Sequence, residues 1–357
     1  MDALYVSLIS VLVSGLCLLV TVPLMLIIER RGSAFMQRRV GPNRVGPFGL
    51  MQPMADALKL IFKEEMVPEK AHKKLFALAP LIGLFPPFLA FAALPISGFI
   101  NVAGVDYPVQ GISLSVGLLF ILSISSLHVF AILAAGWSSN NKFSLLGALR
   151  SSSQMISYEI AIGICVVSVV LTYGSLDLRE IVLKQQIGAG FPWWGWISLP
   201  LPFLILWISS FAETNRLPFD LPEGETELVA GYHSEYSGLR WALFFMGEYS
   251  AMLVASGFLA TLFLGGYTIP FVSELELREF FTSFGLDMFW ASLIAVLLQF
   301  IVFAAKTMFF MWVFVWVRWT LPRFRYDQLM DLGWKVLFPV AIFNAMLTLV
   351  LAYFFKG

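Results

Sequence analysis

The stretch from Met288 to Trp316, MFWASLIAVLLQFIVFAAKTMFFMWVFVW, contains a single charged residue, Lys306, in 29 residues. Runs of about 20 apolar residues span the hydrocarbon core of a bilayer, and a helix satisfies its own backbone hydrogen bonds there. At 1.5 Å per residue, a helix from Trp290 to Trp316 is roughly 40 Å long, whereas the core is about 30 Å thick. This stretch therefore predicts a steeply tilted transmembrane helix.

Seven further apolar runs occur along the chain. Hydrophobic residues make up 59% of the 357 residues and charged residues only 13%, which is more apolar surface than a soluble fold can cover. The short alternating segments of a β-barrel are absent. The predicted fold is all-α: one membrane domain, 1–357, with eight tilted transmembrane helices. The expected spans are 4–28, 76–98, 112–136, 154–173, 195–212, 239–265, 288–316 and 335–355.

The basic residues are distributed unevenly between the two sides of this expected bundle. The odd-numbered loops, with their helix ends, hold 18 of the 23 Lys and Arg residues, whereas the even-numbered loops and the C-terminus hold four. Loops rich in Lys and Arg stay on the cytoplasmic side of a membrane. We therefore expect the odd-numbered loops on the cytoplasmic side and both termini on the opposite side.

The first of these loops, 29–75, is rich in arginine and contains an amphipathic segment. From residue 50 it reads LMQPMADALKLIFKEE, in which apolar residues recur at helical spacing while Gln, Asp and Lys mark the other face. A helix of this kind beside a membrane is expected to lie in the interface. Packing beneath a partner protein is the alternative, and the two placements are compatible.

The fifth loop, 213–238, concentrates acidic residues. It reads ETNRLPFDLPEGETELVAGYHSEYSG, with six acidic residues and one basic residue, Arg216. Pro and Gly break it into turns, and apolar residues alternate with the acids, which a solvated tail would not need. We expect the loop to pack back on the domain and to hold its carboxylates in a partly buried funnel.

Three ionisable residues lie inside the expected spans: Glu159, Glu248 and Lys306. A charge in such a place costs roughly 2.5–3.5 kcal/mol on insertion scales, so it usually faces a cavity or a partner. Because burial disfavours the charged form of a carboxyl group, a buried Glu can take and give protons near neutral pH. The two glutamates are therefore candidate proton carriers, with a structural, hydrogen-bonded acid as the alternative. The roles of Lys306 and His128 stay open.

The sequence predicts no metal site and no bound cofactor. Cys17 and Cys165 lie in different spans without a CxxC pair, and the three histidines have no ligand spacing. The chain also contains neither a GxGxxG motif nor a Walker loop. A redox centre or nucleotide site in this chain is therefore not expected.

Four motifs, taken in chain order, carry a family resemblance. They are RRVGPNRVGPFG, RSSSQMISYEI, ETNRLPFDLPEGETELVAGYHSEYSG and RFRYDQLM. Together with the eight spans they resemble the H subunit of bacterial respiratory NADH:quinone oxidoreductase (complex I), which is homologous to mitochondrial NADH dehydrogenase subunit 1. The resemblance covers essentially the whole chain.

This resemblance implies a multi-pass subunit of the bacterial or mitochondrial inner membrane, placed under the hydrophilic arm of a proton-pumping complex. Its first span, amphipathic helix and sixth span would frame a quinone chamber, with a quinone such as ubiquinone as substrate. NADH, FMN and iron–sulfur clusters would be held by partner subunits, and no nucleic acid would be involved. The partners would be hydrophilic quinone-site subunits, small membrane subunits and lipid.

The residues that would perform these tasks fall into three groups. The carboxylate relay that couples quinone reduction to proton translocation would comprise Glu159, Glu213, Glu223, Glu225, Glu227 and Glu248. The quinone route would be lined by Phe48, Met51, Ala55 and Leu58. Loops and the hydrophilic arm would be held by charge-assisted hydrogen bonds that Arg30, Arg38, Arg44 and Arg216 donate and that Glu235 accepts.

Other functions fit part of the pattern. The related membrane subunit of an energy-converting hydrogenase uses no quinone, although the full Arg-rich loop and amphipathic helix favour the quinone enzyme. A stand-alone ion-coupled transporter would act when reconstituted alone, and a passive anchor for a soluble partner would not need Glu159 or Glu248. Which quinone is used does not follow from the sequence.

Overall fold

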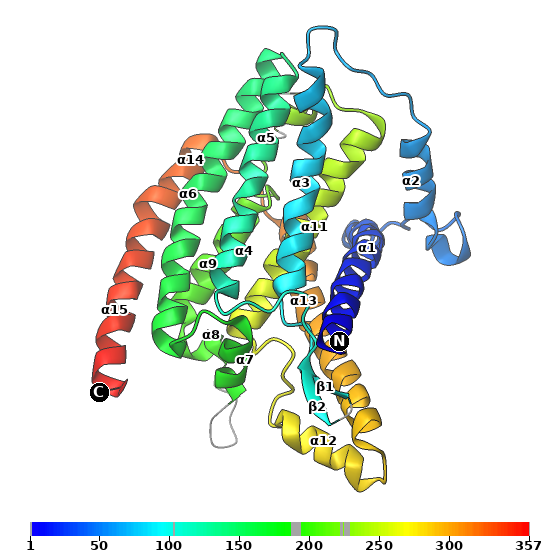
Figure 1. The fold of residues 1–357 in the computed structure, drawn as a ribbon. Coiled ribbons are helices and arrows are strands. Elements are labelled where there is room, and N and C mark those ends of the chain that lie inside the picture. The colour runs from blue at the N-terminus through cyan, green and yellow to red at the C-terminus, as the bar shows by residue number, and fades with distance from the viewer. Residues whose placement is uncertain (1, 103, 187–193, 222–223, 225–228, 357) are drawn as a thin grey trace.

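The computed structural model describes residues 2–102, 104–186, 194–221, 224 and 229–356. Its described part is a bundle of long helices with a small layer of short elements at one end (Figure 1). Within these described ranges, seven helical segments are long and apolar enough to cross a membrane, which confirms a helical polytopic architecture. They are Tyr5–Met36, Lys73–Ala93, Gly117–Ser138, Lys142–Tyr173, Gly238–Phe263, Met288–Thr320 and Tyr326–Phe354.

Five of these segments are continuous α-helices and two are composite. The continuous ones are α1 (Asp2–Met36), α3 (Lys73–Ala93), α6 (Lys142–Tyr173), α11 (Gly238–Phe263) and α13 (Met288–Thr320). The composite ones are α4 (Gly117–Ser125) with α5 (Leu127–Ser138), and α14 (Tyr326–Asp331) with a π-helical turn (Leu332–Leu337) and α15 (Phe338–Lys356).

The expected span 195–212 is divided in the structure. It forms a single turn, α8 (Gly195–Ser198), followed by the 14-residue helix α9 (Pro200–Glu213). Proline at the first position of α9 fits because that position needs no backbone donor. Helix α9 is shorter than the seven long segments, so the predicted count of eight membrane-spanning helices is not confirmed.

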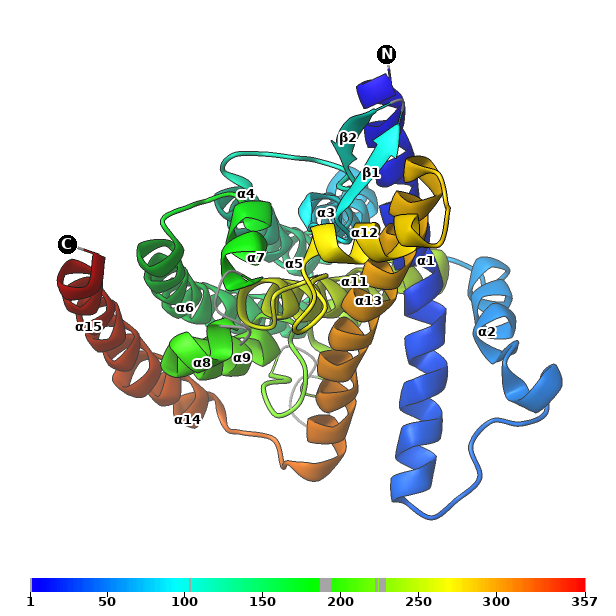
Figure 2. The same cartoon turned by 90° about the horizontal axis from the view of Figure 1, so that it is seen from below.

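Helix α11 occupies the middle of the bundle and packs against α3, α13, α1 and α9. Small residues permit its close approach to α3, as is common between helices in membranes. A Cβ atom on Gly247 would lie 2.9 Å from the backbone oxygen of Gly83 on α3. Figures 1 and 2 show the two helices side by side.

The end of the bundle away from the acidic loop carries a layer of short elements. It contains an antiparallel hairpin, β1 (Phe99–Val102) and β2 (Val105–Pro108), with helices α7 (Leu178–Gln186) and α12 (Glu274–Ser283). Figure 2, which views the molecule from this end, shows these elements in front of the long helices. The hairpin is a small addition to the all-α fold and was not predicted.

The amphipathic segment forms helix α2 (Gln52–Ile61), preceded by a 3-10 turn (Pro47–Gly49). It stands beside α1 on the outside of the bundle (Figure 1). An ion pair of 2.5 Å between Arg30 of α1 and Asp56 fastens the helix to α1. Beyond its end, Glu65 lies 3.2 Å from Arg240 of α11, so the segment bridges α1 and α11.

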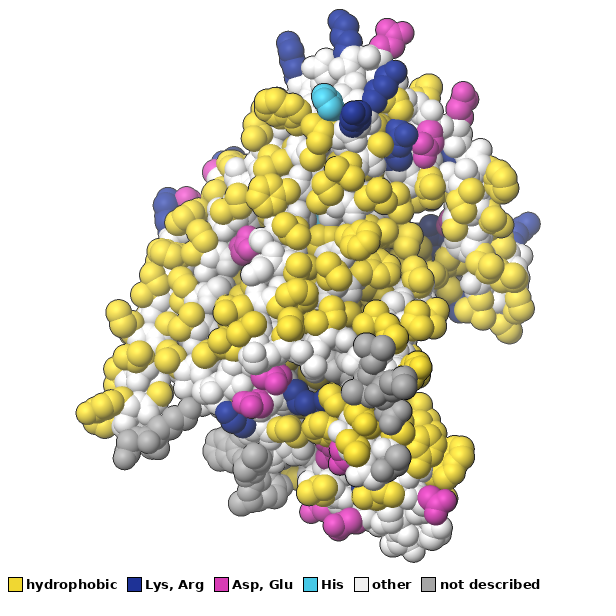
Figure 3. Space-filling view, in the orientation of Figure 1, with side chains coloured by type: hydrophobic (Ala, Val, Ile, Leu, Met, Phe, Trp, Pro, Cys, Tyr) yellow, Lys and Arg dark blue, Asp and Glu magenta, His cyan; other side chains and the backbone are white. Residues whose placement is uncertain are grey.

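The surface matches a membrane-embedded protein. Figure 3 shows a broad field of hydrophobic side chains across the middle of one face, while charged side chains gather above and below it. A hydrophobic band between two charged zones is what a bilayer requires of the protein surface. The tilt of the helices relative to a bilayer stays a prediction.

Candidate functional site

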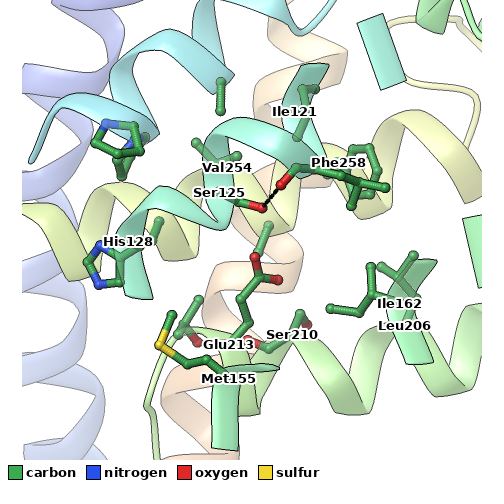
Figure 4. A pocket seen from close by; sticks show the side chains of 17 residues that line it. Ile121, Ser125, His128, Met155, Ile162, Leu206, Ser210, Glu213, Val254 and Phe258 are labelled. Atoms are coloured by element: carbon green, nitrogen blue, oxygen red, sulfur yellow. Dashed lines mark hydrogen bonds between the residues drawn. The ribbon is translucent and has the colours of Figure 1, made fainter. Parts of the chain in front are cut away.

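A cavity of about 50 Å³ lies among α3, α4, α5, α6, α9 and α11 (Figure 4). Most of its wall is apolar, with residues such as Ile121, Ile162 and Phe258. The polar residues that line it are Ser125, His128, Ser210, Glu213 and Thr214. Because Glu213 and Thr214 begin the acidic loop 213–238, the cavity extends to the start of that loop.

Among the described residues, Glu213 contributes the only carboxyl group to the wall of this cavity. It is the last residue of α9, and Figure 4 shows its side chain pointing into the cavity towards Ser125. The Ser125 hydroxyl donates to the carbonyl oxygen of Leu122 at 3.0 Å. Glu159, on the neighbouring helix α6, is close enough to interact electrostatically with Glu213. The structure thus brings two of the predicted relay residues together.

The size of the cavity limits what it can hold. A buried water needs roughly 10–15 Å³, so about 50 Å³ accommodates one or a few waters. Pockets for small organic molecules measure roughly 300–1,000 Å³. The cavity therefore suits water and proton exchange at Glu213, and it is too small for a quinone ring.

Glu248 lies on α11 about one turn before Ala251, which lines the cavity. The residue is 6% exposed, and its carboxyl group accepts a hydrogen bond of 2.9 Å from the Tyr232 hydroxyl. The Nε2 atom of His233 lies 3.7 Å from the same carboxyl oxygen. Tyr232 and His233 belong to a 3-10 turn of the acidic loop, so this loop supplies the direct neighbours of Glu248.

A second buried carboxyl group, Glu29 on α1, was not predicted. Glu29 is 7% exposed and accepts hydrogen bonds from the Tyr249 hydroxyl and from Arg318 of α13. The guanidinium group of Arg216 lies 4.1 Å from the centre of the Tyr249 ring. The only signal in the sequence is an acid directly before two arginines, and that pattern indicates a loop as readily as a buried site.

The described part of the acidic loop packs back on the bundle, as expected. Gln154 of α6 is fully buried and donates hydrogen bonds of 2.8 Å to the carbonyl oxygens of Ala212 and Phe219. Asp220 is buried and forms an ion pair of 3.1 Å with Arg323. Three predicted relay residues lie outside the described residues: Glu223, Glu225 and Glu227.

The residues predicted to line a quinone route lie on or next to α2, away from the cavity. Phe48, Met51 and Leu58 are exposed, at 79%, 49% and 53%, and Ala55 is half-buried. In the described part of the chain they form an exposed apolar surface, so a route for quinone along α2 stays a prediction.

The residues predicted to hold loops or to dock a partner have different surroundings. Arg30 pairs with Asp56 within the chain, whereas Arg38 and Arg44 are exposed. The carboxyl group of Glu235 accepts a hydrogen bond of 2.6 Å from the side-chain amide of Asn141. Glu235 therefore has a contact inside this chain.

The structure gives surroundings for the residues whose roles were left open. Lys306 donates hydrogen bonds to three carbonyl oxygens at the end of α11. The Nδ1 atom of His128 lies 3.3 Å from the carbonyl oxygen of Gly83, while the residue lines the cavity. Among the residues that the structure describes, no group of three or more His, Cys, Asp or Glu side chains could hold a metal ion.

Comparison with known proteins identifies the family. The family model described as NADH dehydrogenase matches residues 9–349. The chain is 47% identical over 354 residues to the H subunit of the NADH-quinone oxidoreductase of Bdellovibrio bacteriovorus, covering 93% of this chain and 92% of the relative. It is 44% identical over 320 residues to an H subunit of the same enzyme from Cytophaga hutchinsonii, covering 90% and 89%. It is 47% identical over 330 residues to NADH-quinone oxidoreductase subunit 8 of Rhodothermus marinus, covering 92% of each. The chain therefore belongs to the family of the H subunits of NADH-quinone oxidoreductase (complex I), and is a membrane subunit of that multi-subunit enzyme.

Proposed function

We propose that this subunit couples quinone reduction to proton translocation through a relay of carboxyl groups that starts in the acidic loop. The observation that carries the proposal is the position of Glu213. Its carboxyl group projects into a water-sized, mostly apolar cavity that begins at the first residues of that loop. A carboxyl group with access to a few waters in an apolar wall can take up and release a proton.

The second step of the relay is the pair of Glu213 and Glu159. Two carboxylates near each other repel, so a proton gained by one changes the proton occupancy of the other. The electrostatic interaction between these two residues supports such a coupled step from α9 to α6.

Glu248 provides a further coupled group within the same helix bundle. Its hydrogen bond from Tyr232 and its proximity to His233 link it directly to the acidic loop. A shift of the turn that carries these two residues would change the polar contacts of Glu248. In the proposed order of proton transfer, the predicted relay residues Glu223, Glu225 and Glu227 would act before these groups.

The quinone entry is proposed along α2, between α1 and α11. The apolar surface of α2 is exposed, and the segment is tied to α1 by Arg30 and to α11 by Arg240. An isoprenoid tail needs an apolar route from the bilayer, and such a helix can provide one wall. The exposed Arg38 and Arg44 would dock the hydrophilic quinone-site subunits by charge-assisted hydrogen bonds.

The orientation proposed places the acidic loop and α2 on the cytoplasmic side of the inner membrane, with both termini on the other side. The 18-to-4 distribution of Lys and Arg supports it. The names of the relatives favour the quinone enzyme over an energy-converting hydrogenase. Membership of a multi-subunit enzyme disfavours a stand-alone transporter.

The proposal is tested with Glu213→Gln and Glu159→Gln in the assembled complex. NADH:quinone turnover and proton pumping are measured in proteoliposomes, and ferricyanide reduction with subunit content checks assembly. Glu180→Gln is the matched control, because this carboxyl group is 58% exposed on α7 and does not line the cavity. We expect a marked loss of coupled turnover in the two test variants and none in the control. Wild-type turnover and pumping in both variants, singly and combined, would show that the relay is wrong.

A further inference from the structure

Three cationic side chains gather at the end of the bundle that lies away from the acidic loop. Arg179 of α7 and Arg278 of α12 are 7% and 4% exposed, and Lys306 of α13 is half-buried. They surround the segment 264–268, which follows α11, in the layer of short elements that Figure 2 shows in front. From Glu248 to Leu264 along α11 the distance is roughly 24 Å at 1.5 Å per residue.

The Lys306 amino group is held by backbone acceptors. Its Nζ atom lies 2.7, 2.8 and 2.8 Å from the carbonyl oxygens of Leu264, Gly266 and Thr268. Three acceptors match the three N–H donors of the ammonium form. These carbonyl groups follow the C-terminal end of α11, where the helix dipole favours a cation. The indole ring of Trp194, 5.0 Å away, adds a cation–π contact.

Arg179 is also held without a carboxylate. Its Nη2 atom donates to the carbonyl oxygens of Ser97 and Gly98 at 2.9 and 2.6 Å, and its guanidinium lies 4.0 Å from the ring centre of Phe99. Arg278, in contrast, pairs with both Asp106 and Glu274. Within the described ranges no ion pair links Arg179 or Lys306 to a carboxylate, and the three cations of this group outnumber its two carboxylates, Asp106 and Glu274.

The same place offers polar positions for water. Arg179 Nε and Nη1, the Tyr267 hydroxyl and the Thr307 hydroxyl are buried and make no hydrogen bond of ordinary geometry within the described residues, although the Tyr267 hydroxyl lies close to Arg179. Buried polar atoms of this kind usually bind ordered water. Water in a membrane domain is a route for protons unless a barrier interrupts it. Fixed positive charges form such a barrier in channels that exclude protons and cations.

We propose that Lys306 and Arg179 form a cationic barrier that prevents protons from leaking through this subunit to the side opposite the acidic loop. A hydrated proton is a cation, so a fixed positive charge lowers its local concentration. A unit charge about 8 Å away at an effective dielectric near 20 lowers that concentration roughly 30-fold. Protons that enter at the acidic end are thereby retained in the membrane domain. This function is separate from the relay and does not depend on it.

The test measures the passive proton permeability of proteoliposomes that contain the whole complex, without NADH, after an external acid pulse. The variants are Lys306→Gln and Arg179→Gln, which keep side-chain hydrogen-bond donors but remove the charge. Lys306→Arg keeps the charge. Lys184→Gln is the matched control, since this lysine is on the same α7 helix as Arg179 but is 41% exposed and lies 3.8 Å from Glu180.

We expect the permeability to rise about tenfold or more in the two charge-removing test variants, while Lys306→Arg and Lys184→Gln stay at the wild-type value. Because no turnover takes place in this assay, failure of the relay would not affect the result. Wild-type permeability in both test variants with normal subunit content would overturn the barrier. If Lys306→Gln and Arg179→Gln failed to assemble while Lys306→Arg assembled, the positive charges would be needed for folding alone. That result would also overturn the barrier.

Discussion

Breaking the ion pair between Arg318 and Glu29 is expected to loosen the attachment of α1 to the bundle. Arg318→Met keeps most of the length of the side chain but removes its charge. A hydrogen bond to a charged group contributes about 1.5–3 kcal/mol. Because the Arg318 side chain is 30% exposed, the lower value, about 1.5 kcal/mol, applies. This free energy corresponds to roughly a tenfold increase in the local opening of α1.

Hydrogen–deuterium exchange of the assembled complex measures that opening directly. Amides of α1 near Glu29 should exchange about tenfold faster in Arg318→Met. Arg323→Met is the matched control, since Arg323 is also 30% exposed and pairs with the buried Asp220. It should accelerate exchange in the acidic loop and not in α1. Unchanged exchange in α1 of a correctly assembled Arg318→Met complex would refute a role of this ion pair in holding the helix.

Three further outcomes are expected. A hydrogen bond from Asn101 lowers the pKa of Asp106 in the folded hairpin. The stability that this gives the hairpin is present above the pKa of the unfolded chain and is lost as pH falls through the lowered pKa of the folded hairpin. Asn101→Leu should move this loss to higher pH in hydrogen-exchange experiments. A Cβ atom on Gly147 would lie 2.8 Å from the backbone of the facing turn, whereas Gly163 has open space; Gly147→Ala should therefore reduce quinone turnover and Gly163→Ala should not. Ala55→Trp should slow quinone turnover while ferricyanide reduction survives, and equal loss of both would indicate failed assembly.

Much of the helical framework could be predicted from the sequence, because lipid permits few structures for a long apolar run. The boundaries were less predictable where polar residues extend a helix beyond the membrane. Helix α6 begins at Lys142 instead of residue 154, through a stretch rich in serine. There the Ser144 hydroxyl donates to the carbonyl oxygen of Tyr232, a contact with the acidic loop that no local pattern reveals.

The candidate site was predictable in part. Glu159 stood out as a carboxyl group inside an expected span and Glu213 as part of the acidic loop, and the two interact electrostatically in the structure. Glu29 did not stand out, since its partners, Tyr249 and Arg318, are 220 and 289 residues away in sequence. Such long-range contacts depend on how the helices pack, which hydrophobic periodicity does not specify.

The cationic end of the bundle was also not predictable. In the sequence, Lys306 stands as an isolated charge inside a span. Its three carbonyl partners belong to a segment about 40 residues earlier in the chain. Only the packing of α13 against the end of α11 shows that this charge is satisfied by the backbone rather than by an acid.

The most direct test of the relay is whether Glu213 changes its protonation during quinone reduction. Infrared difference spectroscopy of the assembled complex, recorded as NADH reduces it in the presence of quinone, detects the carbonyl band of protonated carboxyl groups. We predict a band change in the wild type that is absent in Glu213→Gln and altered in Glu159→Gln, because the proposed relay couples the titration of the two groups. Identical difference spectra for the wild type and Glu213→Gln would contradict the relay.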